Sequence, residues 1–257
     1  MSLGLGTGVP RGGVNTYPTY SIELDGGDYL TVADDDSLSF GDGSADNAMS
    51  ISLWLRLDAT DTNVGIFVKG EEYALTFLQQ YDRLHFRRVD NDANGHIRMI
   101  ATNASVVAGT WHHVLVTSDE SENGNGINIY MDGSDENLQA QTSSYTASEN
   151  DSTDLYIGRG VTTSSGTIGT SYSYITGDMA NIAFWDAELN AGHAAALYSS
   201  GRNLDIANSG IATANLQASW KFAEQTGTTV ADSSSNSNTA TFGDGSTATT
   251  YPTWAEE

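Results

Sequence analysis

The sequence predicts an all-β fold, an antiparallel β-sandwich of two sheets with one short helix. Short runs of alternating apolar and polar residues recur along the 257 residues, as expected for half-buried strands. Turn-forming Gly, Asn, Asp and Ser residues separate these runs at short intervals. Only residues 188–200 are rich in helix formers, with Asn190 placed to cap the helix. Many short strands with a single helix are typical of a β-sandwich.

The predicted strands follow in chain order. The first two, residues 20–24 and 29–32, flank the sequence DGGD, which favours a tight hairpin. In residues 50–57 the odd-numbered positions are Ile or Leu and form one face, while Trp54 lies on the other. The later runs are VGIFVK, YALTFL, RLHFRRV, HIRMIA, HHVLVTS, INIYM, DLYIG, MANIAFW, LQASWKF and TATF.

Charge and cysteine content exclude several classes of function. The chain has 33 acidic and 10 basic residues, a net charge of −23, and no cysteine. Because such a field repels phosphate groups, we expect neither nucleic acid nor a membrane surface as a partner. The absence of cysteine excludes a disulfide scaffold and a thiol nucleophile. No apolar run approaches the length of a membrane span.

The sequence predicts two parts, a glycine-rich arm at residues 1–18 and one domain at residues 19–257. The arm lacks the basic start and the apolar centre of a secretory signal peptide. A terminal arm of this composition is ordered only when other residues hold it. We therefore expect it to dock on its own domain or on a neighbouring subunit.

An ordered set of motifs resembles a known family. Seven segments follow one another within about residues 20 to 200: SISLWLRL, FVKGEEYALTF, GTWHHVLVT, INIYMDG, LYIGRG, GDMANIAFWDAELN and ALYSSG. Together they resemble the laminin-G-like (LamG) domain, a concanavalin-A-like jelly roll. Residues 216–242 resemble a segment that opens the domain in many relatives and closes it here. Because the ends of a sandwich lie close together, a permuted order is physically plausible.

The chain departs from the family at positions tied to function. Relatives often carry an acidic pair where this chain has Ala180 and Asn181, and turn glycines where it has Ser235 and Ser237. Glycoside hydrolases on similar sandwiches carry an E-x-D-x-x-E strand, because cleavage needs paired carboxylates. The nearest match, in residues 149–154, ends in Asp and lies in a polar loop. G-x-S-x-G and H-E-x-x-H motifs are also missing, and we predict no catalytic residue.

Basic and aromatic residues are the candidates for ligand binding. Arg83, His85 and Arg87 alternate along one strand and share a face, which suits an acidic glycan. Pairing with acids on neighbouring strands is the alternative explanation, and a polysaccharide lyase site also stays open. Exposed aromatic rings stack on sugars and anchor interfaces. The predicted ligand-binding residues are Trp54, Arg83, His85, Arg87, Tyr172 and Tyr174.

Two further motifs raise the question of a metal. The turn at residues 230–238 is rich in oxygen ligands of the kind that Ca²⁺ takes, and the resemblance implies Asp232 and Asn236 as ligands of one structural ion. The neighbours His112 and His113 suggest a metal pair at first sight. Successive residues of a strand point to opposite faces, however, so these two rings are not expected to converge on one ion.

Two classes of function remain. The first is a non-enzymatic virion surface protein of a tailed phage, a capsid decoration or fibre module. Its arm, similar to the starts of marine-phage structural proteins, would contact other virion proteins, and its sandwich would adhere to surface glycans. The second is a secreted, extracellular carbohydrate-binding module or polysaccharide-cleaving enzyme. We predict the first, located on the virion surface, with a homo-oligomer as a further expected form.

Overall fold

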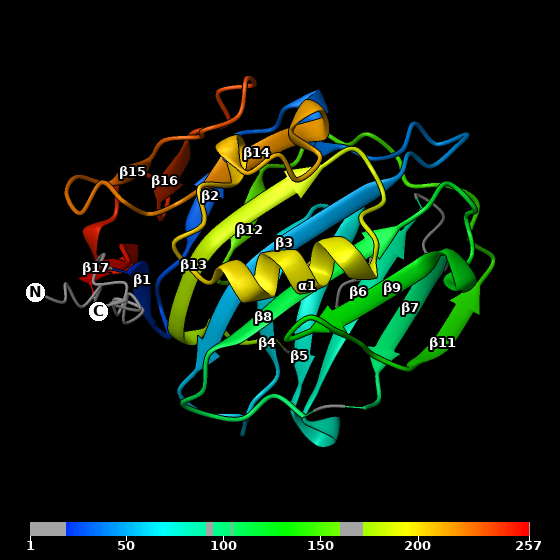
Figure 1. Cartoon of the computed structure of the whole chain (residues 1–257), viewed down its shortest axis with the longest axis horizontal. Helices are drawn as coiled ribbons and strands as arrows, with labels where there is room; N and C mark the ends of the chain where they lie inside the picture. The colour runs from blue at the N-terminus through cyan, green and yellow to red at the C-terminus, as the bar shows by residue number, and fades with distance from the viewer. Residues whose placement is uncertain (1–18, 91–94, 104, 160–171, 257) are drawn as a thin grey trace, which may run out of the picture.

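The computed structural model describes residues 19–256 apart from 91–94, 104 and 160–171. Two antiparallel sheets face each other in this part of the chain, which confirms the predicted sandwich (Figure 1). The predicted docking arm lies outside the described residues. Within them, no helix is long and apolar enough to cross a membrane.

The first sheet has eight strands, in the order β10-β9-β8-β3-β13-β1-β17, with β14 also paired to β13. They are β1 (Tyr20–Asp25), β3 (Met49–Leu57), β8 (His112–Ser118), β9 (Ile127–Met131), β10 (Ser134–Asp135), β13 (Thr176–Trp185), β14 (Leu216–Trp220) and β17 (Thr253–Glu256). Tyr20 stands opposite Glu256 in the ladder, so the first and last strands are neighbours.

The second sheet has nine strands, in the order β11-β7-β6-β5-β4-β12-β2-β16-β15. They are β2 (Leu30–Val32), β4 (Val64–Lys69), β5 (Tyr73–Leu78), β6 (Arg83–Val89), β7 (His96–Ala101), β11 (Leu138–Ser143), β12 (Leu155–Ile157), β15 (Thr229–Val230) and β16 (Ala240–Phe242). The segment after the helix therefore contributes strands to both sheets.

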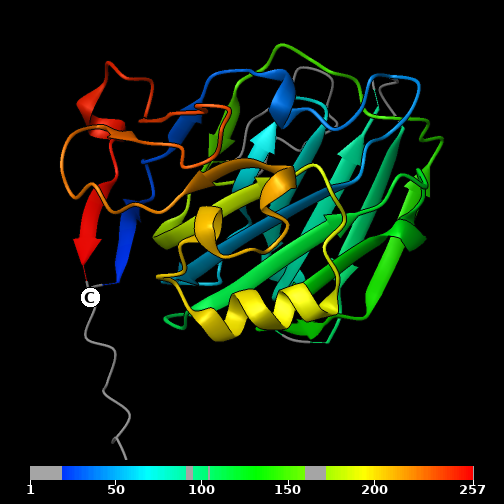
Figure 2. The same cartoon turned by 45° about the horizontal axis from the view of Figure 1, so that its top comes forward.

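The main core fills the space between the sheets. The apolar side chains at positions 51, 53, 55 and 57 of β3 all belong to it, as their alternation predicted. A second cluster lies on the outer face of the eight-stranded sheet, where α1 (Ala191–Ser200) covers the strands (Figure 2). Asn190 caps this helix as predicted, because its side chain accepts hydrogen bonds from the backbone of Gly192 and His193.

Candidate functional site

A pocket of about 300 Å³ lies on the outer face of the nine-stranded sheet. Tyr156 of β12, Thr31 of β2 and Thr241 of β16 line it. These three residues stand opposite one another in the ladder, while their strand neighbours point into the core. Because successive strand residues point to opposite faces, their side chains form one row across the sheet surface.

Arg159, which follows β12, borders this pocket among three tyrosines. The Cζ atom of its guanidinium lies 4.6 Å from the ring centres of Tyr29 and Tyr156 and 5.7 Å from that of Tyr174. The ring centre of Tyr29 is 6.1 Å from that of Tyr156 and 6.0 Å from that of Tyr174. Stacked cation–π contacts of this kind hold a guanidinium in place.

The charged groups of the pocket are one arginine and two aspartates, and they differ in their hydrogen bonds. Arg159 makes no ion pair with a carboxylate of the described residues, and its buried Nε atom has no hydrogen-bond partner among them. Asp154 and Asp244 also line the pocket. Backbone amides of Ser246 and Thr247 donate to Asp244 and hold the pKa of its carboxyl at about 2, so it stays ionised.

This combination of groups is suited to sugars. Aromatic rings offer flat apolar surfaces, and carboxylates and threonine hydroxyls accept hydrogen bonds from hydroxyl groups. A guanidinium donates in a planar fork that fits a carboxylate or sulfate. Tyr174, a predicted ligand-binding residue, lies in this group. Tyr156 and Arg159 were missed, because no local pattern shows that β12 borders β2 and β16.

The predicted basic patch lies on the same sheet face. Arg83, His85 and Arg87 of β6 point outward, and the residues between them point into the core, as predicted. Arg83 donates to Ser105 Oγ and is partly exposed. Tyr172, also partly exposed, lies close enough to Arg87 for its phenol to influence the pKa of the guanidinium. The predicted tyrosines therefore lie beside two different arginines.

His85 has a different role from the predicted one. Its side chain is buried, with only 2% of its surface exposed. Its Nε2 atom accepts a hydrogen bond from Arg98 Nε at 3.2 Å, and its Nδ1 atom lies 3.0 Å from Thr76 Oγ1. Burial and the nearby arginines lower the pKa of His85 to about 3, so the ring is neutral. His85 supports Arg98 rather than facing a ligand.

The prediction of an exposed Trp54 is wrong. The residue does point away from the main core, but only 9% of its surface is exposed. Its ring stacks on Tyr198 of α1 with 5.7 Å between the ring centres, and it lies 5.3 Å from the ring of His113. The helix therefore covers the outward face of β3 at Trp54, where the alternating sequence pattern had allowed contact with a ligand.

Hydrogen bonds within the chain engage the side chains of the predicted calcium site, which stays a prediction. Asp232 Oδ1 accepts hydrogen bonds from the backbone of Ser219 and Ser234, and its Oδ2 accepts from Ser234 Oγ and the backbone of Asn238. The amide nitrogen of Asn236 donates to Gln217, so its donor end is engaged there. A Ca²⁺ ion bound by the Asp232 carboxylate would compete with these bonds to Asp232, whereas Asn236 would bind it through its amide oxygen, which the bonds to Gln217 do not use. Among the described residues, no group of three or more His, Asp or Glu is placed to hold a metal.

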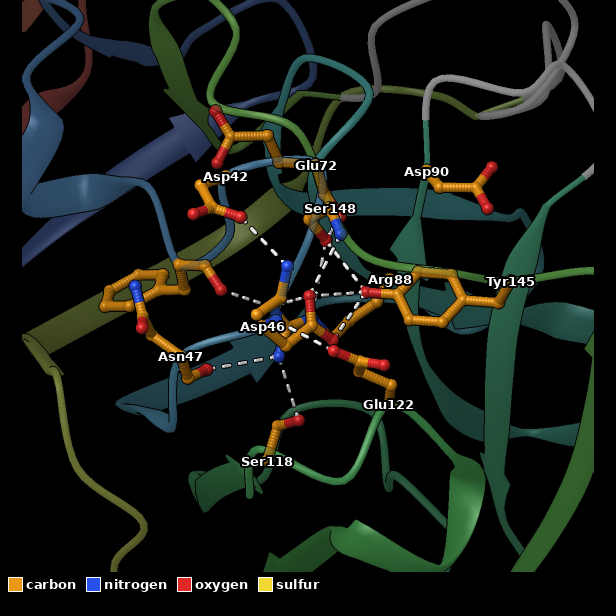
Figure 3. A network of polar contacts seen from close by, with 12 residues as sticks. Asp42, Asp46, Asn47, Glu72, Arg88, Asp90, Ser118, Glu122, Tyr145 and Ser148 are labelled. Atoms are coloured by element: carbon orange, nitrogen blue, oxygen red, sulfur yellow. Dashed lines mark hydrogen bonds and ion pairs between the residues drawn. The ribbon is translucent and has the colours of Figure 1, made fainter.

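A buried polar network at one end of the sandwich belongs to the fold (Figure 3). Arg88 of β6 points inward, forms a 2.9 Å ion pair with Asp46 and donates to Ser118 Oγ of β8 at 3.1 Å. It thereby connects the two sheets. The hydroxyl of Tyr145 donates to Asp46 as well. Because these charges face one another and not solvent, removal of one partner would leave a buried unpaired charge, and neither group is available to a ligand.

Comparisons with known proteins agree on the fold. The family described as the concanavalin A-like lectin/glucanases superfamily matches residues 24–195. A solved structure described as a "putative carbohydrate binding protein" from Bacteroides ovatus is similar, with a TM-score of 0.60, 14% identity, and coverage of 92% of this chain and 59% of that chain. The binding domain of botulinum neurotoxin serotype G has a TM-score of 0.50, 15% identity, and coverage of 72% and 45%. A search of the curated proteins gives no match.

Proposed function

The chain belongs to the concanavalin A-like lectin/glucanases superfamily, and we propose that it binds a glycan at Tyr156 and Arg159 without cleaving it. The observation that carries this proposal is the guanidinium of Arg159, which is stacked on tyrosines and has no carboxylate partner among the described residues. This cation is held in place beside hydroxyl and carboxylate groups that can accept hydrogen bonds from a sugar, so the site is preorganised for a ligand.

The pocket carboxylates support binding rather than cleavage. Glycosidic cleavage needs a carboxyl group that holds a proton for the leaving oxygen, usually through a raised pKa. Asp244 has the opposite property, because its amide partners lower its pKa to about 2. Asp154 accepts a hydrogen bond from the backbone of Asp34 at 3.0 Å, which occupies one of its oxygens. Both groups suit the acceptance of hydrogen bonds from sugar hydroxyls.

Affinity gel electrophoresis against a panel of neutral and acidic polysaccharides tests this proposal. We expect the wild type to be retarded by at least one glycan, and Tyr156→Ala and Arg159→Ala to weaken binding by about tenfold each, equal to about 1.4 kcal/mol. Tyr81→Ala is the matched control, because Tyr81 is half exposed and does not line the pocket. The proposal would be contradicted if no polysaccharide of the panel retarded the protein, or if the protein released shorter sugars from one of them.

We also propose that the protein is displayed on the surface of a tailed-phage virion, where glycan binding would serve adhesion. The support is the similarity of residues 1–14 to the starts of phage structural proteins, together with the strongly acidic composition. Mass spectrometry of purified phage particles that encode the chain tests this. Many copies in each particle are expected. Recovery only from the cell-free medium would favour an extracellular carbohydrate-binding module instead.

A further inference from the structure

We propose that Arg87 and Arg98 form a subsite for a carboxylate or sulfate group, so that the glycan bound on this sheet face is an acidic one. This inference rests on the proposed function and names the class of its ligand. The subsite is separate from the pocket, and its evidence is independent of Arg159.

The first observation is the pairing of two like charges. Arg87 of β6 and Arg98 of β7 stand directly opposite each other in the ladder, and both are partly exposed. Like charges in this position destabilise a sheet. Burial lowers the pKa of Arg87 to about 10, and the charge of Arg98 contributes to the shift as a smaller cause. A bound anion between the two guanidinium groups would turn the repulsion into two attractions.

The second observation is the lack of acidic partners among the described residues, although the chain has 33 acidic residues. Neither Arg87 nor Arg98 forms an ion pair with a carboxylate of the described residues. The buried Nε atom of Arg87 also has no hydrogen-bond partner among them. By contrast, Arg56 and Arg88 each contact an aspartate. Pairing with acids on neighbouring strands therefore does not explain this patch.

The third observation is that Arg98 is held in place. Its Nε atom donates to the neutral ring of His85, which is fixed in turn by Thr76. This is the single hydrogen bond between Arg98 and the described residues. A guanidinium whose orientation is fixed through Nε can present its two Nη groups as a fork to a carboxylate or sulfate. His85 is thus a positioning residue for the subsite.

Sheet register relates the subsite to the pocket. Arg98, Arg87, Ala74, Val68 and Tyr156 stand opposite one another on five neighbouring strands. Arg87 and Tyr156 are therefore three strand spacings apart, roughly 14 Å. Ala74 and Val68 between them are buried, so a polysaccharide with repeated acidic groups that reaches both sites must pass over the residues that cover this part of the row. A free inorganic anion can occupy the arginine pair alone.

The test is affinity electrophoresis with polygalacturonate, hyaluronan and heparin as acidic probes, and with methyl-esterified pectin and dextran as uncharged ones. We expect the acidic probes to retard the wild type, and Arg87→Gln and Arg98→Gln to weaken that binding at least tenfold. Lys221→Gln removes the same charge elsewhere and should change binding less than twofold. Inorganic sulfate at equal ionic strength should compete only in part, because it can fill the arginine pair without reaching from there to the pocket.

Thermal unfolding separates a binding role from a structural one. Arg87→Gln removes one charge of the like-charge pair. Because the Arg87 side chain makes no hydrogen bond with the described residues, the substitution breaks none there. The Tm of the variant should therefore stay the same or rise. A fall in Tm with unchanged binding of the acidic probes would overturn the subsite, as would equal binding of the acidic and the uncharged probes by the wild type. Those results leave the pocket proposal intact. Binding of no polysaccharide would overturn both proposals, and complete displacement of the acidic polysaccharides by inorganic sulfate would overturn the glycan as the ligand.

Discussion

Asp132 shows how one carboxylate orders two neighbouring histidines. It occupies a turn with a left-handed φ of 52°, and its two oxygens bind His112 Nδ1 and the backbone nitrogen of His113, both at 2.8 Å. His112 Nε2 accepts a hydrogen bond from the backbone of Val107, so the proton of this ring lies on Nδ1. His113 points to the other face, where its Nε2 atom lies 2.9 Å from Ser52 Oγ. Strand alternation predicted that the rings diverge, but not that Asp132 binds both residues.

A second carboxylate, Asp28, gives a prediction about pH. Burial, together with Asp25 and Glu23, raises the pKa of Asp28 to about 6. The folded chain then holds this proton more tightly than the unfolded chain, in which the pKa is about 3.9. The contribution of Asp28 to the free energy of unfolding is therefore largest below about pH 4 and is lost as pH rises through about 6.

Asp28→Asn should remove this part of the pH dependence, because asparagine cannot ionise. Urea unfolding of both proteins between pH 4 and pH 7 measures it, and the difference between wild type and variant isolates Asp28 from the other acids. The variant should become more stable relative to the wild type as pH rises. Parallel curves over this range would show that Asp28 titrates at its ordinary pKa.

At the scale of elements, the local sequence pattern predicted the secondary structure of each segment but not its tertiary contacts. Residues 188–200 predicted α1 and its cap at Asn190, and the alternation in residues 83–87 predicted the shared face of β6. The contact of α1 with Trp54 depends on tertiary packing, which alternation does not contain. The pairing of Arg87 with Arg98 depends on register between strands, and the pocket combines strands far apart in the sequence.

The contact between α1 and β3 gives a prediction at this scale. Tyr198 is 41% exposed, yet its ring covers Trp54. Tyr198→Ala should lower the free energy of unfolding by about 1 kcal/mol and make tryptophan fluorescence easier to quench with acrylamide. Tyr198→Phe keeps the ring and should preserve both properties. Equal quenching in the alanine variant and the wild type would show that Tyr198 does not shield Trp54 from solvent.

The whole molecule depends on its last 57 residues, although the family match ends at residue 195. β14 pairs with β13, β16 with β2 and β17 with β1, so this segment extends both sheets. It also places Trp220, Phe222 and Phe242 in the core. A chain that ends at residue 200 would lose these rings and leave β13, β2 and β1 each with an unpaired strand edge.

Chain order should nevertheless be open to change. Tyr20 and Glu256 are ladder partners, so a short glycine linker can join β17 to β1. New ends fit at Ser209 and Gly210, because Gly210 is exposed and lies in the short connection between η4 (Ile206–Asn208) and η5 (Thr213–Asn215). We expect a permuted chain that starts at Gly210 and ends at Ser209 to unfold cooperatively within a few degrees of the wild-type Tm, since it keeps every strand pair. The chain that ends at residue 200 should show no cooperative transition by circular dichroism. If the truncated chain folds, the first 200 residues form a stable sandwich without the last strands. If the permuted chain does not fold, the order of the strands along the chain matters as much as their pairing.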